Sequence, residues 1–72
     1  MPITDKDLEN WFTYHAPKPD DPPKYLAIRE AGLLLAKTIR DNTPACADQT
    51  AAIRKVREAV ATANASIACE GR

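Results

Sequence analysis

Apolar residues recur every three or four positions in two long stretches of the chain, which is the spacing of one face of an α-helix. The apolar positions of the first stretch are Tyr25, Ile28, Leu35 and Ile39, with Gly32 in the same series. Those of the second stretch are Ile53, Val56, Val60, Ala63 and Ile67. Because the two stripes match, we expect an antiparallel pair of helices over residues of about 22–41 and 48–69, joined by a turn over residues 42–47.

A short additional helix is expected before the first stripe. Thr4, followed three residues later by Asp7, is typical of a capping box at a helix start. This helix is expected over residues of about 5–14, because Pro17 pushes the residue before it out of the helical region. Residues 16–23 contain four prolines and predict a stiff, extended connector.

The starts of the two long helices are marked by capping residues. Asp21 is expected to cap the second helix, with Pro22 at the first helical position, where its missing N–H is not needed. The third helix has two alternative starts, because Thr43 ahead of Pro44 would begin it earlier than the turn over residues 42–47 allows.

The second helix also carries apolar residues that a two-helix hairpin does not bury. Leu26, Leu33 and Leu34 lie off the stripe, and another chain is needed to cover them. With 72 residues the chain has room for one domain, residues 1–72, and a core of that size seldom folds without a disulfide, a metal or oligomerisation.

Neither a disulfide nor a metal fits the sequence. Cys46 and Cys69 stand near opposite ends of the third helix, roughly 34 Å apart at the rise of an α-helix, whereas a disulfide needs Cα atoms about 4.4–6.8 Å apart. His15 is the only histidine, and no metal-ligand spacing is present. We therefore predict an all-α fold, a short N-terminal helix plus an antiparallel two-helix hairpin, assembled as a homo-oligomer without metal or cofactor.

Charge narrows the classes of partner. The formal net charge is zero and the sequence pI is about 6.5, whereas a nucleic-acid binder is expected above about 9. The longest apolar run, residues 33–36, is too short to span a membrane, and two unpaired thiols suit the cytoplasm. Acidic residues dominate positions 1–23 and basic residues dominate positions 24–72, so an anionic ligand is expected on the second part.

The segment Trp11-Phe12-Thr13-Tyr14-His15 holds three of the four aromatic residues, directly before the proline connector. One interpretation is that Trp11 and Phe12 fold down as a lid on the hairpin. The other is that the rings stack on a base, which is worth about 1–3 kcal/mol per base. Arg29 and Lys24 follow on the second helix, within reach of this segment, either as solvated charges, as partners of Glu30 or Asp21, or as contacts for an anionic ligand.

Catalysis has little support in the sequence. Ser66 is the only serine and has no plausible base, and the glycines are single, so no phosphate-binding loop exists. Two residues carry open alternatives: Asn64 either fixes helix register or contacts a ligand, and Gly32 marks either close helix packing or a ligand against the backbone. We therefore expect a binding protein and not an enzyme.

The same residues resemble the helical-hairpin family of phage anti-CBASS and anti-Thoeris proteins, which are sponges for cyclic nucleotides. The resemblance covers about residues 8–68 and rests first on the aromatic run followed by Pro17. Its other parts are Tyr25 with Ile28-Arg29-Glu30-Ala31, and Arg57-Glu58-Ala59-Val60 with Ala63-Asn64-Ala65 and Ile67. Two positions depart from it, Ala45 where the family has a second proline and Ala61 where it has a methionine.

This resemblance implies a phage protein of the bacterial host cytoplasm that captures cyclic dinucleotides without cleaving them, and in some members cyclic trinucleotides or ADP-ribose-derived signals. It implies a homohexamer in which Tyr14 stacks on a base and Arg29 meets a phosphate, each contributed by two protomers. The other positions carried over to the ligand site are Trp11, His15 and Lys24, and Arg57 and Asn64, whose roles stay open. The alternative function is a helical-hairpin adapter whose aromatic segment docks a protein partner.

Overall fold

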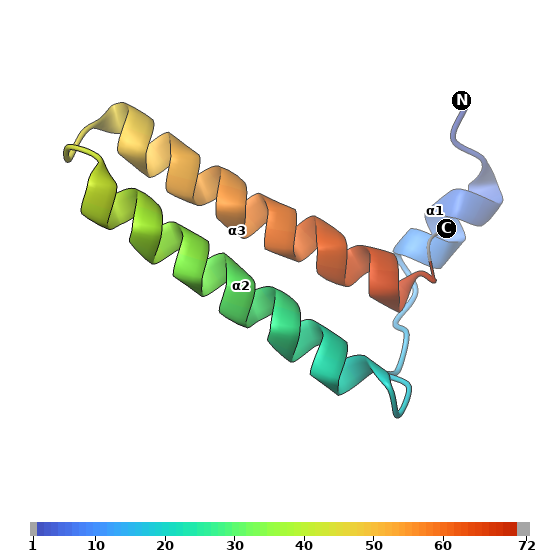
Figure 1. Cartoon of the computed structure of the whole chain (residues 1–72). Coiled ribbons are helices and arrows are strands. Elements are labelled where there is room, and N and C mark those ends of the chain that lie inside the picture. The colour runs from blue at the N-terminus through green and yellow to red at the C-terminus, as the bar shows by residue number, and fades with distance from the viewer. Residues whose placement is uncertain (1, 71–72) are drawn as a thin grey trace.

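A computed structural model describes residues 2–70 and contains three α-helices and no strand in this range (Figure 1). Helix α1 spans Asp5–Trp11, α2 spans Asp21–Asn42, and α3 spans Ala47–Ala68. The all-helical prediction is therefore confirmed over the described residues, while positions 1, 71 and 72 of the expected domain lie outside them. None of these helices is both long enough and apolar enough to cross a membrane.

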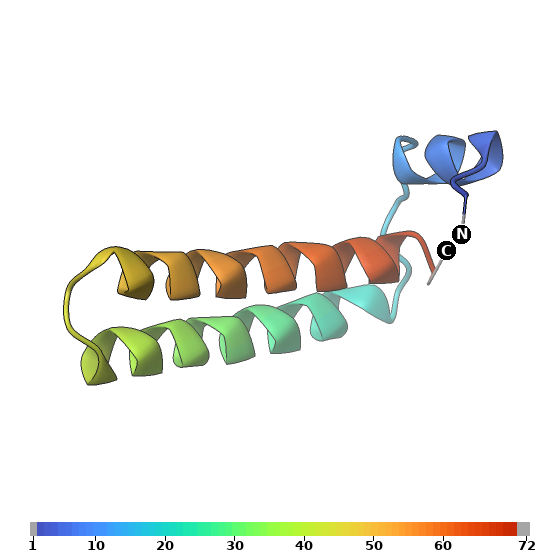
Figure 2. The ribbon, with the colours of Figure 1, turned by 90° about the horizontal axis from the view of Figure 1, so that it is seen from above.

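The two long helices run side by side in opposite directions, and α1 lies at their open end, away from the turn (Figures 1 and 2). The Cα atoms of α1 stay more than 8 Å from those of α2 and α3, which pack against each other. The molecule is elongated, with a radius of gyration of 15.3 Å against about 11 Å for a compact chain of this length. We call residues 2–20, which comprise α1 and the proline connector, the arm.

The capping box predicted at the start of α1 is present. The Thr4 hydroxyl accepts a hydrogen bond from the Asp7 N–H at 3.1 Å, and the Asp7 carboxylate accepts one from the Thr4 N–H at 3.0 Å. The helix ends at Trp11 and not near residue 14. Just beyond it, the Thr13 hydroxyl donates to the Glu9 carbonyl, and such side-chain bonds compete with continued helix.

The predicted capping role of Asp21 is wrong. Asp21 is the first residue of α2, Asp20 occupies the cap position, and no side-chain capping bond is made there. The Asp21 carboxylate instead turns back to the arm, where it accepts a hydrogen bond from the Lys18 N–H at 2.9 Å. Its side chain is buried because it serves this turn of the connector.

The two stripes meet between α2 and α3, with one change from the predicted set. Gly32 lies so close to α3 that a Cβ added to it would stand 2.6 Å from Val60 Cγ2, which confirms that Gly32 serves close helix packing. Leu35, predicted to lie on the stripe, is 51 % exposed, and Ala36 is half-buried in its place. Glycine and alanine bring the helices together here and leave the longer leucine at the edge of the contact.

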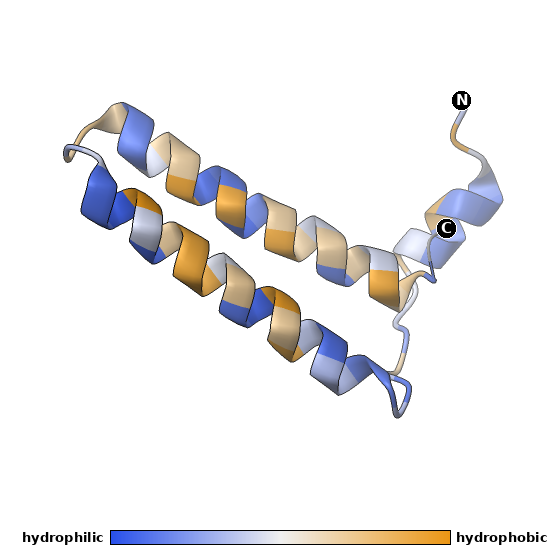
Figure 3. Cartoon of the chain, in the orientation of Figure 1, coloured by the Kyte–Doolittle hydropathy of each residue, from blue (hydrophilic) through white to orange (hydrophobic). Residues whose placement is uncertain are grey.

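The described residues form almost no interior. Cys69 is the one buried apolar residue in this range, and no large side chain is fully buried. Leu33, Leu34 and Leu35 are 57 %, 68 % and 51 % exposed on α2. Apolar residues recur along both long helices (Figure 3), and on α2 these three leucines stay uncovered by α3.

Candidate functional site

The aromatic side chains of the arm are presented to solvent at the open end of the hairpin. Phe12 is 86 % exposed and Tyr14 is 83 % exposed, whereas Trp11, the last residue of α1, is 45 % exposed. The interpretation of Phe12 as a lid on the hairpin is therefore wrong within one chain, because α1 does not pack on α2 or α3. The phenol ring of Tyr14 is available for stacking.

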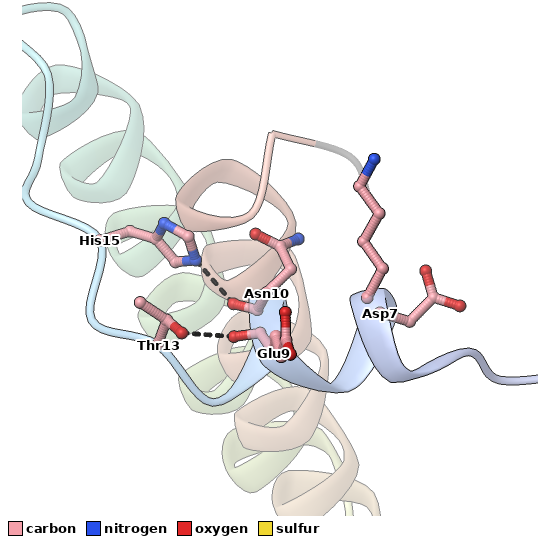
Figure 4. Close-up of a pocket in the computed structure, with 6 residues that line it drawn as sticks. Asp7, Glu9, Asn10, Thr13 and His15 are labelled. Carbon is pink, nitrogen blue, oxygen red and sulfur yellow. Dashed lines mark hydrogen bonds between the residues drawn. The ribbon is translucent and has the colours of Figure 1, made fainter.

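His15 is held by a neighbour on α1. Its Nε2 lies 2.6 Å from the Asn10 backbone oxygen, and because a carbonyl only accepts, Nε2 carries the hydrogen in this contact (Figure 4). His15 also lines an open pocket of about 380 Å³. The other residues around that pocket are Lys6, Asp7, Glu9, Asn10 and Thr13.

The arm is fastened to the end of α3 through polar contacts. The Asn10 side-chain Nδ2 donates to the Cys69 carbonyl at 3.5 Å, and the Cys69 thiol lies 3.9 Å from the Asn10 carbonyl oxygen. Further along the connector, the Lys18 ammonium forms an ion pair with Glu70. These contacts position the segment that carries Tyr14 and His15.

Arg29 and Arg57 line the same groove, a pairing that the sequence analysis did not predict. The groove has a volume of about 410 Å³ and lies between α2 and α3, with an apolar floor that includes Gly32, Val56 and Val60. Both arginines are exposed. Two guanidinium groups at an apolar groove suit an anionic ligand that also has a flat or apolar part.

A second groove of about 460 Å³ is also lined by Gly32, Val56 and Val60, but its other lining residues differ from those of the first groove. The α2 residues that line it, 28, 31 and 35, flank Gly32 on the opposite side from residues 29, 33 and 36 of the first groove. It is lined almost wholly by apolar atoms, with Lys55 as its one charged residue. On either side of Gly32, one face of the hairpin therefore has two arginines at its groove and the other face has one lysine.

Lys24 and Asn64 have separate surroundings. Lys24 is exposed in the first turns of α2. Asn64 is half-buried on α3, and its Oδ1 atom is buried without a hydrogen-bond partner. An unsatisfied buried oxygen costs about 1–3 kcal/mol, so this amide is a feature that helix packing alone does not explain.

Tyr14 and Arg29 come from different parts of one chain. The pocket at the arm is lined by residues between 6 and 15, whereas the groove that contains Arg29 is lined by hairpin residues. Asn10, which fastens the arm, was not among the predicted site residues, because nothing in its sequence neighbourhood marks it. The Arg29–Arg57 pair follows from the register of the two stripes once Gly32 is placed opposite Val60.

Two side chains with shifted pKa values lie near the turn between α2 and α3, at the end of the hairpin away from the arm. The hydrogen bond between Arg40 and Asp41, 2.9 Å long, raises the pKa of Arg40 and lowers the pKa of Asp41. Both side chains are exposed near the turn. In residues 2–70 no three histidine, cysteine, aspartate or glutamate side chains are grouped to hold a metal.

The fold and these side chains define a helical-hairpin protein with an aromatic arm and an arginine-lined groove. The sequence model of the family described as Acb2/Tad1, hairpin domain, matches residues 4–68. The chain therefore belongs to the Acb2/Tad1 hairpin family, the family of anti-CBASS and anti-Thoeris sponges. Searches of curated proteins and of solved structures returned no match for this chain.

Proposed function

We propose that this protein binds cyclic nucleotide second messengers and holds them without cleaving them, so that bacterial CBASS or Thoeris effectors lose their signal. Family membership supports anti-defence sequestration as the general activity. Cyclic dinucleotides are the proposed ligands, with cyclic trinucleotides or ADP-ribose-derived signals as further candidates. The proposed place of action is the cytoplasm of the phage-infected host.

The observation that carries this proposal is the exposed Tyr14 ring on an arm fixed by hydrogen bonds. A ring that is 83 % exposed has little packing role in its own chain. The connector limits where it can move, because Lys18 and Asp21 hold the turn ahead of α2. Such a preorganised ring is suited to stacking on a base, since little conformational entropy is then lost on binding.

The symmetry of the ligand favours a site built by two protomers. A cyclic dinucleotide has two bases and two phosphates, and a two-fold interface presents Tyr14 and Arg29 twice. Two stacks at about 1–3 kcal/mol each and two charged hydrogen-bonding groups at about 1.5–3 kcal/mol each give roughly 5–12 kcal/mol before the cost of association. Tight capture therefore needs a site that the oligomer has already assembled.

Oligomerisation is also supported by the exposed apolar side chains. Leu33, Leu34 and Leu35 together with the apolar groove leave both faces of a thin hairpin uncovered. A homohexamer is the assembly proposed for this chain. The remaining proposed ligand contacts are Trp11, His15, Lys24, Arg57 and Asn64.

Isothermal titration with a cyclic dinucleotide tests the proposal. Binding is expected for the native protein, and ligand released by heating should be recovered chemically intact, as chromatography and mass measurement will show. Tyr14→Ala and Arg29→Ala should each abolish measurable binding. Arg40→Ala at the distal end of α2 removes a similar exposed arginine and should bind normally.

Two outcomes would contradict the proposal. Recovery of a linear or hydrolysed nucleotide would indicate a phosphodiesterase. Absence of binding across a panel of cyclic dinucleotides, cyclic trinucleotides and cyclic ADP-ribose compounds would favour the alternative function, a hairpin adapter that docks a protein partner through its aromatic segment.

A further inference from the structure

Asn10 links three parts of the molecule at the open end of the hairpin. Its carbonyl oxygen accepts a hydrogen bond at 2.6 Å from Nε2 of His15, the residue just before the connector (Figure 4). The same oxygen lies 3.9 Å from the Cys69 thiol, which is the donor in that contact. Its side-chain Nδ2 donates to the Cys69 carbonyl at 3.5 Å. One residue of α1 therefore contacts both the segment that follows Tyr14 and the C-terminal cap of α3.

These contacts matter because apolar packing does not hold the arm. The Cα atoms of α1 are more than 8 Å from those of both long helices. The hydrogen bond from the Asn10 side-chain amide to the Cys69 carbonyl is long, at 3.5 Å, and such a hydrogen bond is weak. The hairpin does not depend on it, since α2 and α3 pack through their own stripes. Loss of the bond should therefore loosen the arm, which the Lys18–Glu70 ion pair and the contact of the Cys69 thiol with the Asn10 carbonyl still hold, and leave the hairpin folded.

Tyr14 directly precedes His15, so the position of its backbone follows from the position of His15. Tyr14 itself is 83 % exposed, so the packing of its side chain does little to fix its position. We infer that Asn10 is a positioning residue for the ligand-binding segment. It ties the backbone around Tyr14 to the end of α3, so that the ring is held ready for the ligand. This inference rests on the proposed function of Tyr14.

The first measurement compares Asn10→Ala with the native protein. Removal of the amide should weaken binding of a cyclic dinucleotide about tenfold, which corresponds to about 1.4 kcal/mol. The thermal midpoint of the hairpin should stay unchanged in far-UV circular dichroism. Asn42→Ala is the matched control, because it deletes the same side chain and the same type of bond, from Asn42 Nδ2 to the Thr38 carbonyl, at the distal end of α2.

A reversible tether provides the rescue. Asn10→Cys in a Cys46→Ala background adds a thiol at the residue that contacts Cys69, and a thiol oxidant such as diamide should join the two sulfurs, each losing one hydrogen. The product should be an intrachain disulfide, which a non-reducing gel and a mass lower by two hydrogens will identify. Ligand affinity should be weak in the reduced protein and should return to the native value in the oxidised protein.

A readout without ligand separates this inference from the proposed function. Trp11 is the only tryptophan and lies in the arm. Its fluorescence anisotropy should fall in Asn10→Ala and in reduced Asn10→Cys, and should recover on oxidation. If the native protein binds no nucleotide but the anisotropy still changes in this way, the proposed function fails while the docked arm stands.

Three results would overturn the inference. The first is unchanged affinity and unchanged anisotropy in Asn10→Ala. The second is failure of the Asn10→Cys protein to form the disulfide, or formation of a disulfide between chains, because the arm would then not rest on its own α3. The third is an oxidised protein whose Trp11 anisotropy shows a docked arm but whose ligand affinity stays weak. Attachment of the arm to α3 would then not be what positions Tyr14 for the ligand.

Discussion

Gly32 sets the separation of the two long helices at a single point. A Cβ at this position would lie 2.6 Å from Val60 Cγ2, a distance that real side chains avoid, and 4.0 Å from Val60 Cβ, which is ordinary contact. The obstacle is therefore one methyl group on α3. Glycine costs about 1 kcal/mol of helix stability relative to alanine, so its presence in the middle of α2 reflects packing.

Substitution of this glycine should have an effect that depends on residue 60. Gly32→Ala should destabilise the native protein by about 1 kcal/mol, because overpacking at about 1–3 kcal/mol outweighs the gain in helix propensity. In a Val60→Ala background the same substitution should stabilise, since the clashing methyl is gone. Urea unfolding followed by circular dichroism at one fixed protein concentration will measure both. Destabilisation of equal size in the two backgrounds would contradict close packing at Gly32.

At the scale of elements, side chains around the hairpin turn donate hydrogen bonds to carbonyls in the last turns of α2 and at its C-cap residue. Asn42 Nδ2 donates to the Thr38 carbonyl at 2.8 Å, and the Thr43 hydroxyl donates to the Ile39 carbonyl at 2.6 Å. Gln49, from the first turn of α3, donates to the Arg40 and Thr43 carbonyls at 3.1 and 3.2 Å. The bond from Gln49 to the Arg40 carbonyl joins the two helices across the turn.

Gln49→Ala should lower the free energy of unfolding by about 1 kcal/mol, because a typical hydrogen bond contributes about 0.5–1.5 kcal/mol net. Thermal unfolding will show the change as a lower midpoint. Thr50→Ala is the control, since its hydroxyl bond to the Cys46 carbonyl is long at 3.4 Å and stays within its own helix start. An equal loss in both variants would show that Gln49 has no special part in closing the turn.

At the scale of the whole molecule, a thin hairpin with hardly any interior is consistent with a protein that is completed by its own copies. Leu34 is 68 % exposed on α2, and a core of this size seldom sustains a fold alone. The arm at one end and the grooves on the two faces leave most of the surface available to other chains.

Leu34→Glu should weaken self-association at least about tenfold, since burial of an unpaired charge is costly. Sedimentation velocity over a range of concentrations should show smaller species than the native protein. Thr62→Glu, which adds the same charge at an exposed position of α3, is the control and should leave assembly unchanged. A native protein that sediments as a stable monomer would contradict the proposed oligomer.

The sequence alone determined the elements that depend on neighbours within a few positions. The stripes led to α2 and α3, and Thr4 with Asp7 led to the capping box. For Gly32 the sequence left two alternatives, of which the structure confirms close helix packing. The family resemblance was also readable from the aromatic run and the two helix motifs, and the match over residues 4–68 confirms it. These features follow from spacing and side-chain type, which the order of residues specifies directly.

Only the tertiary structure decided how distant segments meet. Asn10 contacts Cys69 across 59 positions, and Arg29 and Arg57 line the same groove, although neither pairing has a local signal. The hydrophobicity of Phe12 and Leu35 predicts burial, but Leu35 stays at the edge because Gly32 and Ala36 set the helix spacing, and Phe12 stays exposed because α1 does not pack on α2 or α3. Long-range geometry arises from the packing of whole helices, and sequence periodicity fixes a face of a helix without fixing its partner.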